Sequence, residues 1–525
     1  MSTEDAEQLA LDGLAPRKRR KRAPAVKTPA AEHPIAQVVL DIQAIHLGQT
    51  FDYYVEEKYS EAAQPGVMVR VRFGGQRVNG IIWKRTDTSE TPESSLRFIE
   101  RVVIDRVLVS ESMRNDATLI ADAFGGTRAN ILRLAVPPRV ARVEQEQRIG
   151  NRTGIEKNGR IESLAKIERE SYEQLQRQYG NIDLLRTALE GQRFQAFVLD
   201  PLPGSHHWRQ CVAWMVAAAL LQGKPAVLVL PTMREIEDMA ETLQSIGLRC
   251  FAPTQSSNGA YGGDFAILNA QMAPAERYRA YLAISGGQVR CVIGTRAAMY
   301  APVDGNALFL ILDDVCYQDA DGMMPYANAR GVLRLRAKAH NGVFVAMANA
   351  RSVQSQWETD AAHVGATQVS GFSTPIHAFP AVTKEASPWI RWLNRDELAR
   401  LADSTIGARV PHTAVRVLSK ALESGPVLLS IPQDGIGEAL SCAKCHRQAR
   451  CSYCAGAEPT VSWRAHCAFN AEPATRHCSR YRVCAAVGHR HSRRRTPCTW
   501  EEPLGMRIPG RGHSRRMDQL VRLRH

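Results

Sequence analysis

The chain has 525 residues, too many for one hydrophobic core, so we expect two to four domains. Apolar residues make up 44% and charged residues 23% of it, as is typical of a globular protein. No apolar run reaches the roughly 18 residues of a membrane span, and the N-terminus lacks the apolar segment of a secretory signal. We therefore predict a cytoplasmic protein with no membrane partner.

The net charge of +14 is concentrated at the two ends of the chain. Residues 442–525 contain 17 Lys and Arg against 5 Asp and Glu, residues 1–33 contain 7 against 5, and the middle is neutral. The run 17–22 (RKRRKR) is typical of a solvated, disordered tail, and the alternative is a loose, salt-sensitive attraction to phosphate. The charge favours a polyanionic partner and does not indicate a fold.

The N-terminal third contains short β-branched and aromatic stretches separated by Gly, Pro and Asn, a pattern that predicts a small antiparallel barrel or sheet. The predicted strands are 37–40, 51–55, 67–73 and 79–84. In the third strand, alternation places Arg70 and Arg72 on one face and Val69, Val71 and Phe73 on the buried face. The arginines form either a solvated surface or a nucleic-acid surface in which Phe51 stacks on a base, and spacing alone favours neither.

After a charged, helical segment, apolar runs alternate with helical patterns, which predicts a parallel sheet covered on both faces by helices. We interpret residues 143–192 as a connector, because they show little apolar periodicity. The predicted strands are 194–199, 226–230, 289–293, 308–312, 343–347 and 427–431, with helices at 210–221 and 234–246. Residues 455–525 contain 14 Arg, 6 His and no Lys without periodicity, so we expect disorder.

Two C-x-x-C pairs, Cys442 with Cys445 and Cys451 with Cys454, are separated by five residues. Four thiolates in such turns suit tetrahedral Zn²⁺, whereas four free thiols in this spacing rarely arise by chance. The pairs predict Zn²⁺ in one four-cysteine site or in two interleaved sites completed by distant ligands. The later cysteines, which form no C-x-x-C pair, are weaker candidate ligands: Cys467, Cys478, Cys484 and Cys498.

Gly204 and Ser205 lie between a predicted strand and a predicted helix, where a phosphate-binding loop is expected. Proline at positions 201 and 203 removes backbone donors, and His207 and Trp208 replace the lysine and hydroxyl residues that such a loop requires. We predict that this loop does not bind ATP.

Asp313 and Asp314 follow an apolar strand, as in a Walker B element, in which an Asp holds Mg²⁺ and a Glu activates water. Asp314 is one methylene shorter than that Glu. A buried strand with a polar end explains the pattern equally well. We interpret Asp313 and Asp314, together with Gly204 and Ser205, as a degenerate nucleotide site that has no catalytic residue.

Residues 36–454 resemble the family of primosomal replication-restart proteins PriA (primosomal protein N′). Residues 50–53 (TFDY) and 66–74 (GVMVRVRFG) are similar to the start of that family's N-terminal domain, and the C-x-x-C pairs match the first two of its four. The resemblance implies a domain that captures the 3′ end of a nascent leading strand, with Asp52 accepting a hydrogen bond from the 3′-hydroxyl. It implies pocket residues at Phe51, Asp52, Gly74 and Arg97, which join Arg70 and Arg72 as candidate DNA-binding residues.

Other segments resemble helicase motifs in altered form. Residues 293–297 (IGTRA) and 325–330 (PYANAR) are similar to lobe motifs of the family, whereas 347–349 (MAN) and 432–435 (PQDG) stand where S-A-T and N-R-R-G occur. This shared loss resembles the actinobacterial branch of the family, in which the helicase motifs have decayed. The abrupt change of composition after Cys454 leads us to expect a truncated or frame-shifted C-terminus.

These expectations combine into a multidomain α/β chain. It comprises a disordered basic tail (1–35), a β-rich 3′-end-binding domain (36–112), a winged-helix-like segment with a helical connector (113–192), a degenerate RecA-like helicase lobe (193–440), zinc knuckles (441–454) and an Arg/His-rich tail (455–525). The leading hypothesis is a replication-restart initiator that binds forked and single-stranded DNA, primosome proteins and the replicative helicase, without helicase activity. The alternatives are an ATP-dependent 3′→5′ DNA helicase and a zinc-dependent interaction module without fork specificity.

Overall fold

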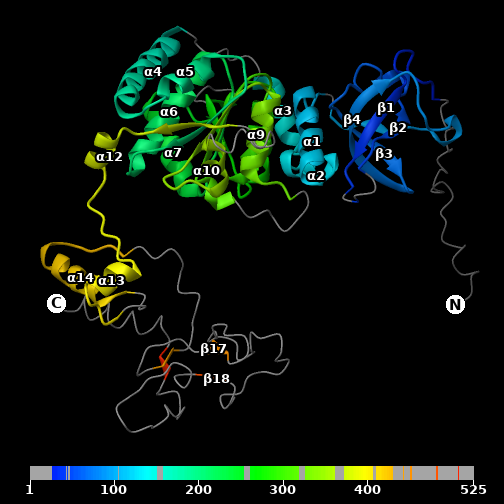
Figure 1. Ribbon diagram of the computed structural model, residues 1–525. Helices are drawn as coiled ribbons and strands as arrows, with labels where there is room; N and C mark the ends of the chain where they lie inside the picture. The colour runs from blue at the N-terminus through cyan, green and yellow to red at the C-terminus, as the bar shows by residue number, and fades with distance from the viewer. Residues whose placement is uncertain are drawn as a thin grey trace, which may run out of the picture. The chain divides into compact units, whose positions relative to one another are not determined.

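The computed structural model describes residues 27–42, 44, 48–104, 106–150, 158–253, 261–317, 326–360, 372–405 and 410–429, together with four two-residue strands nearer the C-terminus. The run 17–22, the segment 432–435 and most of the C-terminal cysteines lie outside these residues. The chain divides into two compact units, Met1–Pro388 and Trp389–His525. The first unit contains both large sheets (Figure 1).

The N-terminal sheet has six strands in the order β5-β2-β1-β4-β3-β6, and its four long strands confirm the sequence prediction. The strands are β1 (Ile35–Leu40), β2 (Phe51–Tyr54), β3 (Met68–Phe73), β4 (Gln76–Thr86), β5 (Arg97–Phe98) and β6 (Arg101–Val102), with 3-10 turns η2 (Glu57–Tyr59) and η3 (Glu93–Ser95) between them. Along β3, Val69 and Val71 are buried and Arg72 is exposed, as alternation predicts.

A short segment, 97–102, closes this sheet. Its first part, β5, pairs with β2, and its last part, β6, pairs with β3 at the opposite edge. Two consecutive amides bridge the edges, because Ile99 N donates to Tyr54 O at 2.9 Å and Glu100 N donates to Arg70 O at 2.8 Å. Both edges of the sheet are therefore covered by one stretch of chain, which leaves a small barrel with a buried aliphatic core.

Five helices follow the barrel: α1 (Glu111–Phe124), α2 (Arg128–Ala135), α3 (Ala141–Gly150), α4 (Asn158–Gln178) and α5 (Ile182–Glu190). The described residues between 111 and 190 contain no strand, so the hairpin of a winged helix is not found among them. The connector interpretation of 143–192 is wrong for the end of that range. Leu175, Leu185 and Leu189 are buried against the following domain, because their spacing gives α4 and α5 one apolar face each.

The following domain is built on seven parallel strands in the order β11-β12-β8-β13-β14-β7-β15. The strands are β7 (Gln195–Asp200), β8 (Ala226–Val229), β11 (Phe265–Leu268), β12 (Cys291–Gly294), β13 (Leu308–Leu312), β14 (Val343–Met347) and β15 (Thr374–His377). The connecting elements are α6 (Ser205–Leu221), α7 (Met233–Ser245), β9 (Ala252–Pro253), β10 (Tyr261–Gly262), α8 (Pro274–Ser285), η4 (Arg296–Tyr300), η5 (Asp314–Tyr317), α9 (Ala329–Ala339), α10 (Val353–Thr359) and α12 (Pro380–Ala386). Five strands match the prediction, whereas the four-residue strands β11 and β15 were not predicted.

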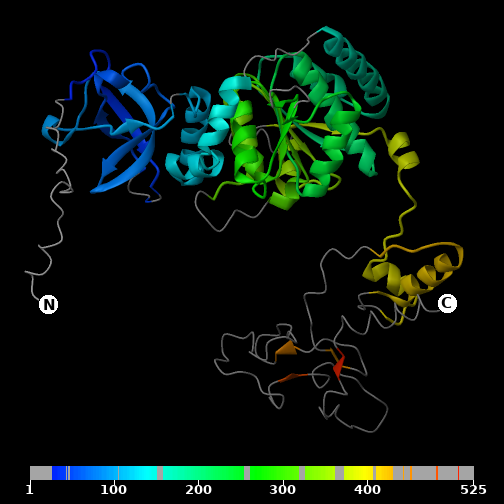
Figure 2. The same ribbon diagram turned by 180° about the vertical axis from the view of Figure 1, so that it is seen from behind.

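Two hydrophobic cores cover the two faces of this sheet. Along β13, Leu308, Leu310 and Leu312 join the core beneath α4 to α7, whereas Phe309 and Ile311 join the core shared with α1, α2, α8 and α9. Figure 1 and the reverse view in Figure 2 show these helices on opposite sides of the sheet. The continuous apolar runs in the sequence reflect strands that are buried on both faces.

The second unit contains α13 (Arg395–Arg400), α14 (His412–Ser424) and the short strands β16 (Ser441–Cys442), β17 (Arg450–Cys451), β18 (Tyr481–Arg482) and β19 (Met506–Arg507). The predicted strand 427–431 is wrong for its described part: residues 427–429 form no strand, and Leu428 is 91% exposed without a partner strand. Among the described residues, none of the helices is both long and apolar enough to cross a bilayer.

Arg336 joins the helical segment to the parallel-sheet domain. It lies on α9 at 1% exposure and donates to Asp116 of α1 at 2.8 Å and to the carbonyl oxygen of Ala301 at 2.7 Å. His340 contacts the other Asp116 oxygen at 3.0 Å. Burial alone raises the pKa of Asp116, but Arg336 and His340 reverse that effect and hold it below its ordinary value. The buried charges are therefore paired rather than isolated.

We predict that Arg336→Leu lowers the free energy of unfolding of this unit by about 3–5 kcal/mol, because it leaves the Asp116 carboxylate buried without its cation. Lys338→Leu on the same helix is the control, since Lys338 is exposed and its replacement costs at most about 0.5 kcal/mol. Urea unfolding of the two variants measures the difference. Equal destabilisation by the two substitutions would contradict this role for Arg336.

Candidate nucleic-acid interface

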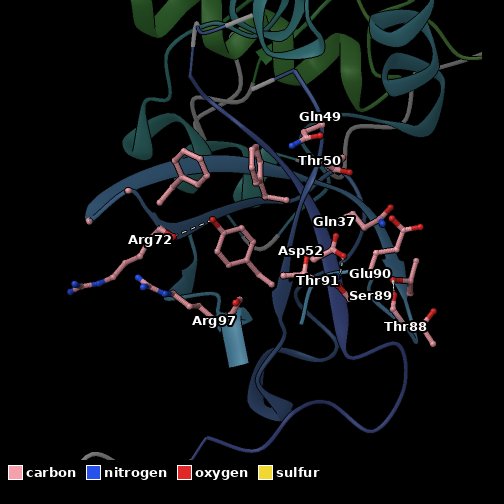
Figure 3. A pocket seen from close by; sticks show the side chains of 17 residues that line it. Gln37, Gln49, Thr50, Asp52, Arg72, Thr88, Ser89, Glu90, Thr91 and Arg97 are labelled. Atoms are coloured by element: carbon pink, nitrogen blue, oxygen red, sulfur yellow. Dashed lines mark hydrogen bonds between the residues drawn. The ribbon is translucent and has the colours of Figure 1, made fainter. Parts of the chain in front are cut away.

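A pocket of about 960 Å³ opens where the segment 97–102 closes the barrel. Figure 3 shows Arg72 and Arg97 on one side of it and Ser89, Glu90 and Thr91 on the other, with Asp52 between them. Five of the six candidate DNA-binding residues line this pocket: Phe51, Asp52, Arg72, Gly74 and Arg97. A pocket of this volume is large enough to accommodate a nucleotide-sized ligand.

Asp52, on β2, and Glu90 each bring a carboxylate to the pocket, and Asp52 lies between its two sides. Ser89 Oγ donates to Asp52 Oδ2 at 2.5 Å and accepts a hydrogen bond from the Thr91 backbone amide at 3.0 Å. Because that amide orients the Ser89 hydroxyl, the carboxylate is held by the loop between β4 and β5. Within the described part of the chain, Asp52 Oδ1 has no hydrogen-bond partner, so it can accept a hydrogen bond from a ligand.

The wall of the pocket beside Asp52 is aromatic. Phe51, at the start of β2, and Phe73, at the end of β3, meet edge to face with ring centroids 4.7 Å apart. Tyr53 donates its hydroxyl to the Arg72 carbonyl oxygen at 3.1 Å, as the dashed line in Figure 3 marks. Burial raises the pKa of Tyr53 to about 12, against a smaller opposing effect of Arg97. The phenol therefore remains a hydrogen-bond donor at neutral pH.

Gly74 and Gly75 form the tight turn between β3 and β4. Their φ angles are +56° and +82°, a left-handed pair that suits a two-residue hairpin and favours glycine. A Cβ atom added at Gly74 would meet no atom within 4 Å, so the backbone conformation, and not space, requires glycine. The turn places the Gly74 backbone at the edge of the pocket.

Arg70 lies outside the pocket. Its Nε donates to Asn79 Oδ1 at 3.0 Å on the neighbouring strand, and it shares the outer face of β3 with Arg72. The sequence prediction also missed several polar residues that line the pocket: Gln37, Gln49, Thr50, Thr86, Thr88, Ser89, Glu90, Thr91 and Ser95. For the five of these residues that lie within 86–91, the run of short polar residues there was the one signal in the sequence.

The candidate nucleotide loop lies at the carboxyl end of β7, between that strand and α6, as predicted. Gly204 has φ +115° and precedes the helix that begins at Ser205. Burial and the neighbouring His206 lower the pKa of His207, so its ring is neutral at pH 7 and carries no charge toward a phosphate. Asp200 at the strand end is already bound, by both Arg351 at 2.8 and 2.9 Å and His377 at 2.7 Å.

Asp314 is part of a buried network instead of facing an open site. It is 2% exposed and accepts hydrogen bonds from Arg330 at 2.9 Å and from Ser352 and Ser355 at 2.5 Å each. Arg330 continues to Glu358 through two contacts of 2.8 Å. With its Oδ2 oxygen committed to these donors, Asp314 serves as a structural acceptor between β13, α9 and α10. The sequence pattern around Arg330 did not indicate that Arg330 binds Asp314.

Asp313 occupies a strained position beside this network. Its φ of +51° turns the chain sharply after β13, and its amide donates to the Met347 carbonyl oxygen at 2.8 Å. Burial, with the nearby charges of Glu235 and Asp314, raises the pKa of Asp313. Asp313 and Gly204 thus lie at the same edge of the sheet, the carboxyl end of its strands, where ligands of such sheets bind.

The zinc prediction lies mostly outside the described residues. Only the backbones of Cys442 and Cys451 are described, in β16 and β17. The other candidate ligands lie in the undescribed part: Cys445, Cys454, Cys467, Cys478, Cys484 and Cys498. The cysteines described with side chains are Cys211, Cys250, Cys291 and Cys316, all with free thiols. The zinc sites remain a prediction.

Comparison with known proteins gives a consistent result. Residues 37–137 match the family model of the PriA 3′DNA-binding domain. The chain is 30% identical over 414 residues to the probable replication restart protein PriA of Mycobacterium leprae and 30% identical over 419 residues to that of Mycobacterium tuberculosis. Each match covers 78% of this chain and 58% of the relative.

A more distant relative, the replication restart protein PriA of Chlamydia pneumoniae, is 22% identical over 280 residues, which cover 53% of this chain and 34% of the relative. The chain spans a little over half the length of the two mycobacterial proteins. The matched segment 37–137 contains the whole barrel and the pocket at its closure. The chain is thus a relative of the replication restart proteins PriA and carries, at residues 37–137, a match to their 3′DNA-binding domain.

Proposed function

We propose that this chain recognises a DNA fork by binding the 3′ end of a nascent strand in the barrel pocket. The observation that carries the proposal is the pocket itself, which gathers a carboxylate, two guanidinium groups and aromatic rings on a domain that matches a 3′DNA-binding family. Asp52 Oδ1 accepts a hydrogen bond from the terminal hydroxyl. Arg72 and Arg97 at the opposite side attract the adjoining phosphates.

The carboxylate gives this pocket its selectivity. A 3′-hydroxyl is a hydrogen-bond donor, whereas a 3′-phosphate carries negative charge and acceptor oxygens. Placed beside Asp52, the phosphate is repelled and offers no donor. The pocket therefore distinguishes an extendable strand end from a blocked one, which is the distinction that a fork-recognition protein requires.

We propose further that fork binding leads to primosome assembly and reloading of the replicative helicase, as the relatedness to replication restart proteins suggests. The parallel-sheet domain acts as a scaffold and does not hydrolyse ATP. The sequence Asp200–Trp208 contains no lysine, and Asp314 is committed to Arg330 and two serines. The zinc knuckles provide a contact surface for partner proteins or DNA.

The test of fork recognition compares two synthetic forks, one with a 3′-hydroxyl and one with a 3′-phosphate at the junction, by fluorescence anisotropy. We expect the full chain to prefer the hydroxyl by about ten- to a hundredfold, because a hydrogen bond to a charged group contributes about 1.5–3 kcal/mol. Asp52→Ala removes the preference. Ser89→Ala reduces it, because the loop no longer holds the carboxylate.

Thr88→Ala is the matched control for these variants. Thr88 lines the same pocket from the same loop, is exposed, and forms no side-chain hydrogen bond with Asp52 in the described structure. The Thr88→Ala variant should prefer the 3′-hydroxyl fork over the 3′-phosphate fork by the same factor as the unmodified chain. Equal binding of both forks by the unmodified chain, steeply dependent on salt, would show that only the basic ends bind DNA and would refute the proposal.

The absence of ATP turnover is tested by phosphate release with and without single-stranded DNA. We expect the rate to equal the protein-free blank in both cases, and Asp313→Ala to leave it unchanged, because the loop after β7 offers no cation for the β- and γ-phosphates. The alternative, an ATP-dependent helicase, predicts release that DNA stimulates and that Asp313→Ala abolishes.

Zinc binding is tested by elemental analysis of the purified full chain. A four-cysteine site predicts about one Zn²⁺ per chain, which is absent when Cys442 and Cys445 are both replaced by serine. Cys316→Ser is the control, because Cys316 is an exposed thiol of the parallel-sheet domain. About two ions per chain would require the later cysteines, and an unchanged metal content in the double variant would exclude the knuckles as ligands.

A further inference from the structure

The outer face of the barrel beside the pocket carries four arginines, which we call the arginine face: Arg70, Arg72, Arg77 and Arg101. On the neighbouring strands, the residues directly opposite these arginines are not acidic. Arg72 lies directly opposite Arg77 on β4, and Arg70 lies directly opposite Arg101 on β6. Like charges at directly opposed positions destabilise a sheet, so this arrangement needs an explanation outside the fold.

One carboxylate partly compensates the arginine face. Glu100 pairs with Arg72 at 2.7 Å and with Arg77 at 3.0 Å, and hydrogen bonding from Arg72 first, then Arg77, lowers the pKa of Glu100. Arg70 donates to the neutral Asn79, and among the described residues Arg101 forms no ion pair. Arg72 and Arg77 keep 50% and 65% of their side-chain surface exposed, so the excess positive charge faces solvent.

The two arginine pairs lie one after the other along β3, starting at the pocket. The Arg72–Arg77 pair lies next to the Gly74 turn at the pocket, and the Arg70–Arg101 pair lies two residues farther along β3. Two residues of a strand span about 7 Å, which equals about two steps of axial rise in a DNA duplex. Figure 3 shows the Arg72 and Arg97 side chains extending side by side at the pocket's edge, so the positive charge begins at the pocket.

We propose that the arginine face binds the phosphate backbone of the same DNA strand whose 3′ end occupies the pocket. The proposal rests on the proposed function and adds the path of the strand: from Asp52 past Arg72 and Arg77 to Arg70 and Arg101. The pocket reads the end of the strand, and the arginine face holds the nucleotides before it without reading their sequence. Phosphates beside the Arg70–Arg101 pair offset the repulsion there, where the fold supplies no carboxylate among the described residues.

The test measures how affinity for a synthetic fork with a 3′-hydroxyl depends on salt, using the full chain and a double variant, Arg77→Gln with Arg101→Gln. Neither residue lines the pocket. Removing one arginine–phosphate interaction should reduce the slope of log K against log salt by about one, so the slope of the double variant should fall by about two. Its preference for a 3′-hydroxyl over a 3′-phosphate should stay that of the unmodified chain.

The matched control is Arg133→Gln with Lys338→Gln, which removes the same charge from exposed positions on α2 and α9. This variant should keep the unmodified slope. A slope for the arginine-face variant equal to that of the control would overturn the inference while leaving the hydroxyl preference, and so the proposed function, intact. A reduced slope without any hydroxyl preference in the unmodified chain would refute both the proposed function and the assigned strand path.

Discussion

The pocket depends on one constraint, the closure of the barrel by residues 97–102. Consecutive amides of this segment bind opposite edges of the sheet, Ile99 to β2 and Glu100 to β3. The closure brings Arg97 beside Tyr53 and places Glu100 between Arg72 and Arg77. Without it, the two sides of the pocket would belong to separate edges of an open sheet, and both edges would expose unpaired backbone groups.

In the parallel-sheet domain, the carboxylates beside the two candidate nucleotide loops form structural contacts. Asp314 is bound by Arg330, Ser352 and Ser355, and Asp200 is bound by Arg351 and His377, so hydrogen bonds within the chain occupy carboxylates of the two candidate nucleotide loops. Asp314 is buried, and a buried charge is stable only when it is paired, whereas Asp200 keeps 31% of its side chain exposed. The domain is stabilised by these networks and by its two apolar cores.

The sequence predicted the long strands of both sheets because burial on one face or two gives a readable pattern. The family resemblance implied a pocket at Phe51, Asp52, Gly74 and Arg97, and the structure places these four around one cavity. Arg72, a candidate from strand alternation, lines the same cavity. The sequence missed Ser89 and the 86–91 loop, because short polar residues in a loop carry no periodicity. It missed the closure, because β5 and β6 have two residues each and their pairing is set by tertiary contacts. The sequence did not predict the ion pair of Asp314 with Arg330, because no regular spacing in a sequence marks a buried ion pair.

The most direct test of the account is photocrosslinking of the full chain to a fork whose 3′-terminal nucleotide carries a photoreactive base and an intact hydroxyl, followed by peptide mapping. The account predicts crosslinks to the peptides that contain Phe51 or residues 86–91, which line the pocket from its two sides. It also predicts that these crosslinks disappear when the terminal hydroxyl is replaced by phosphate. Crosslinks confined to the basic run 17–22 or to residues 455–525 would contradict it, because the strand end would then lie outside the pocket.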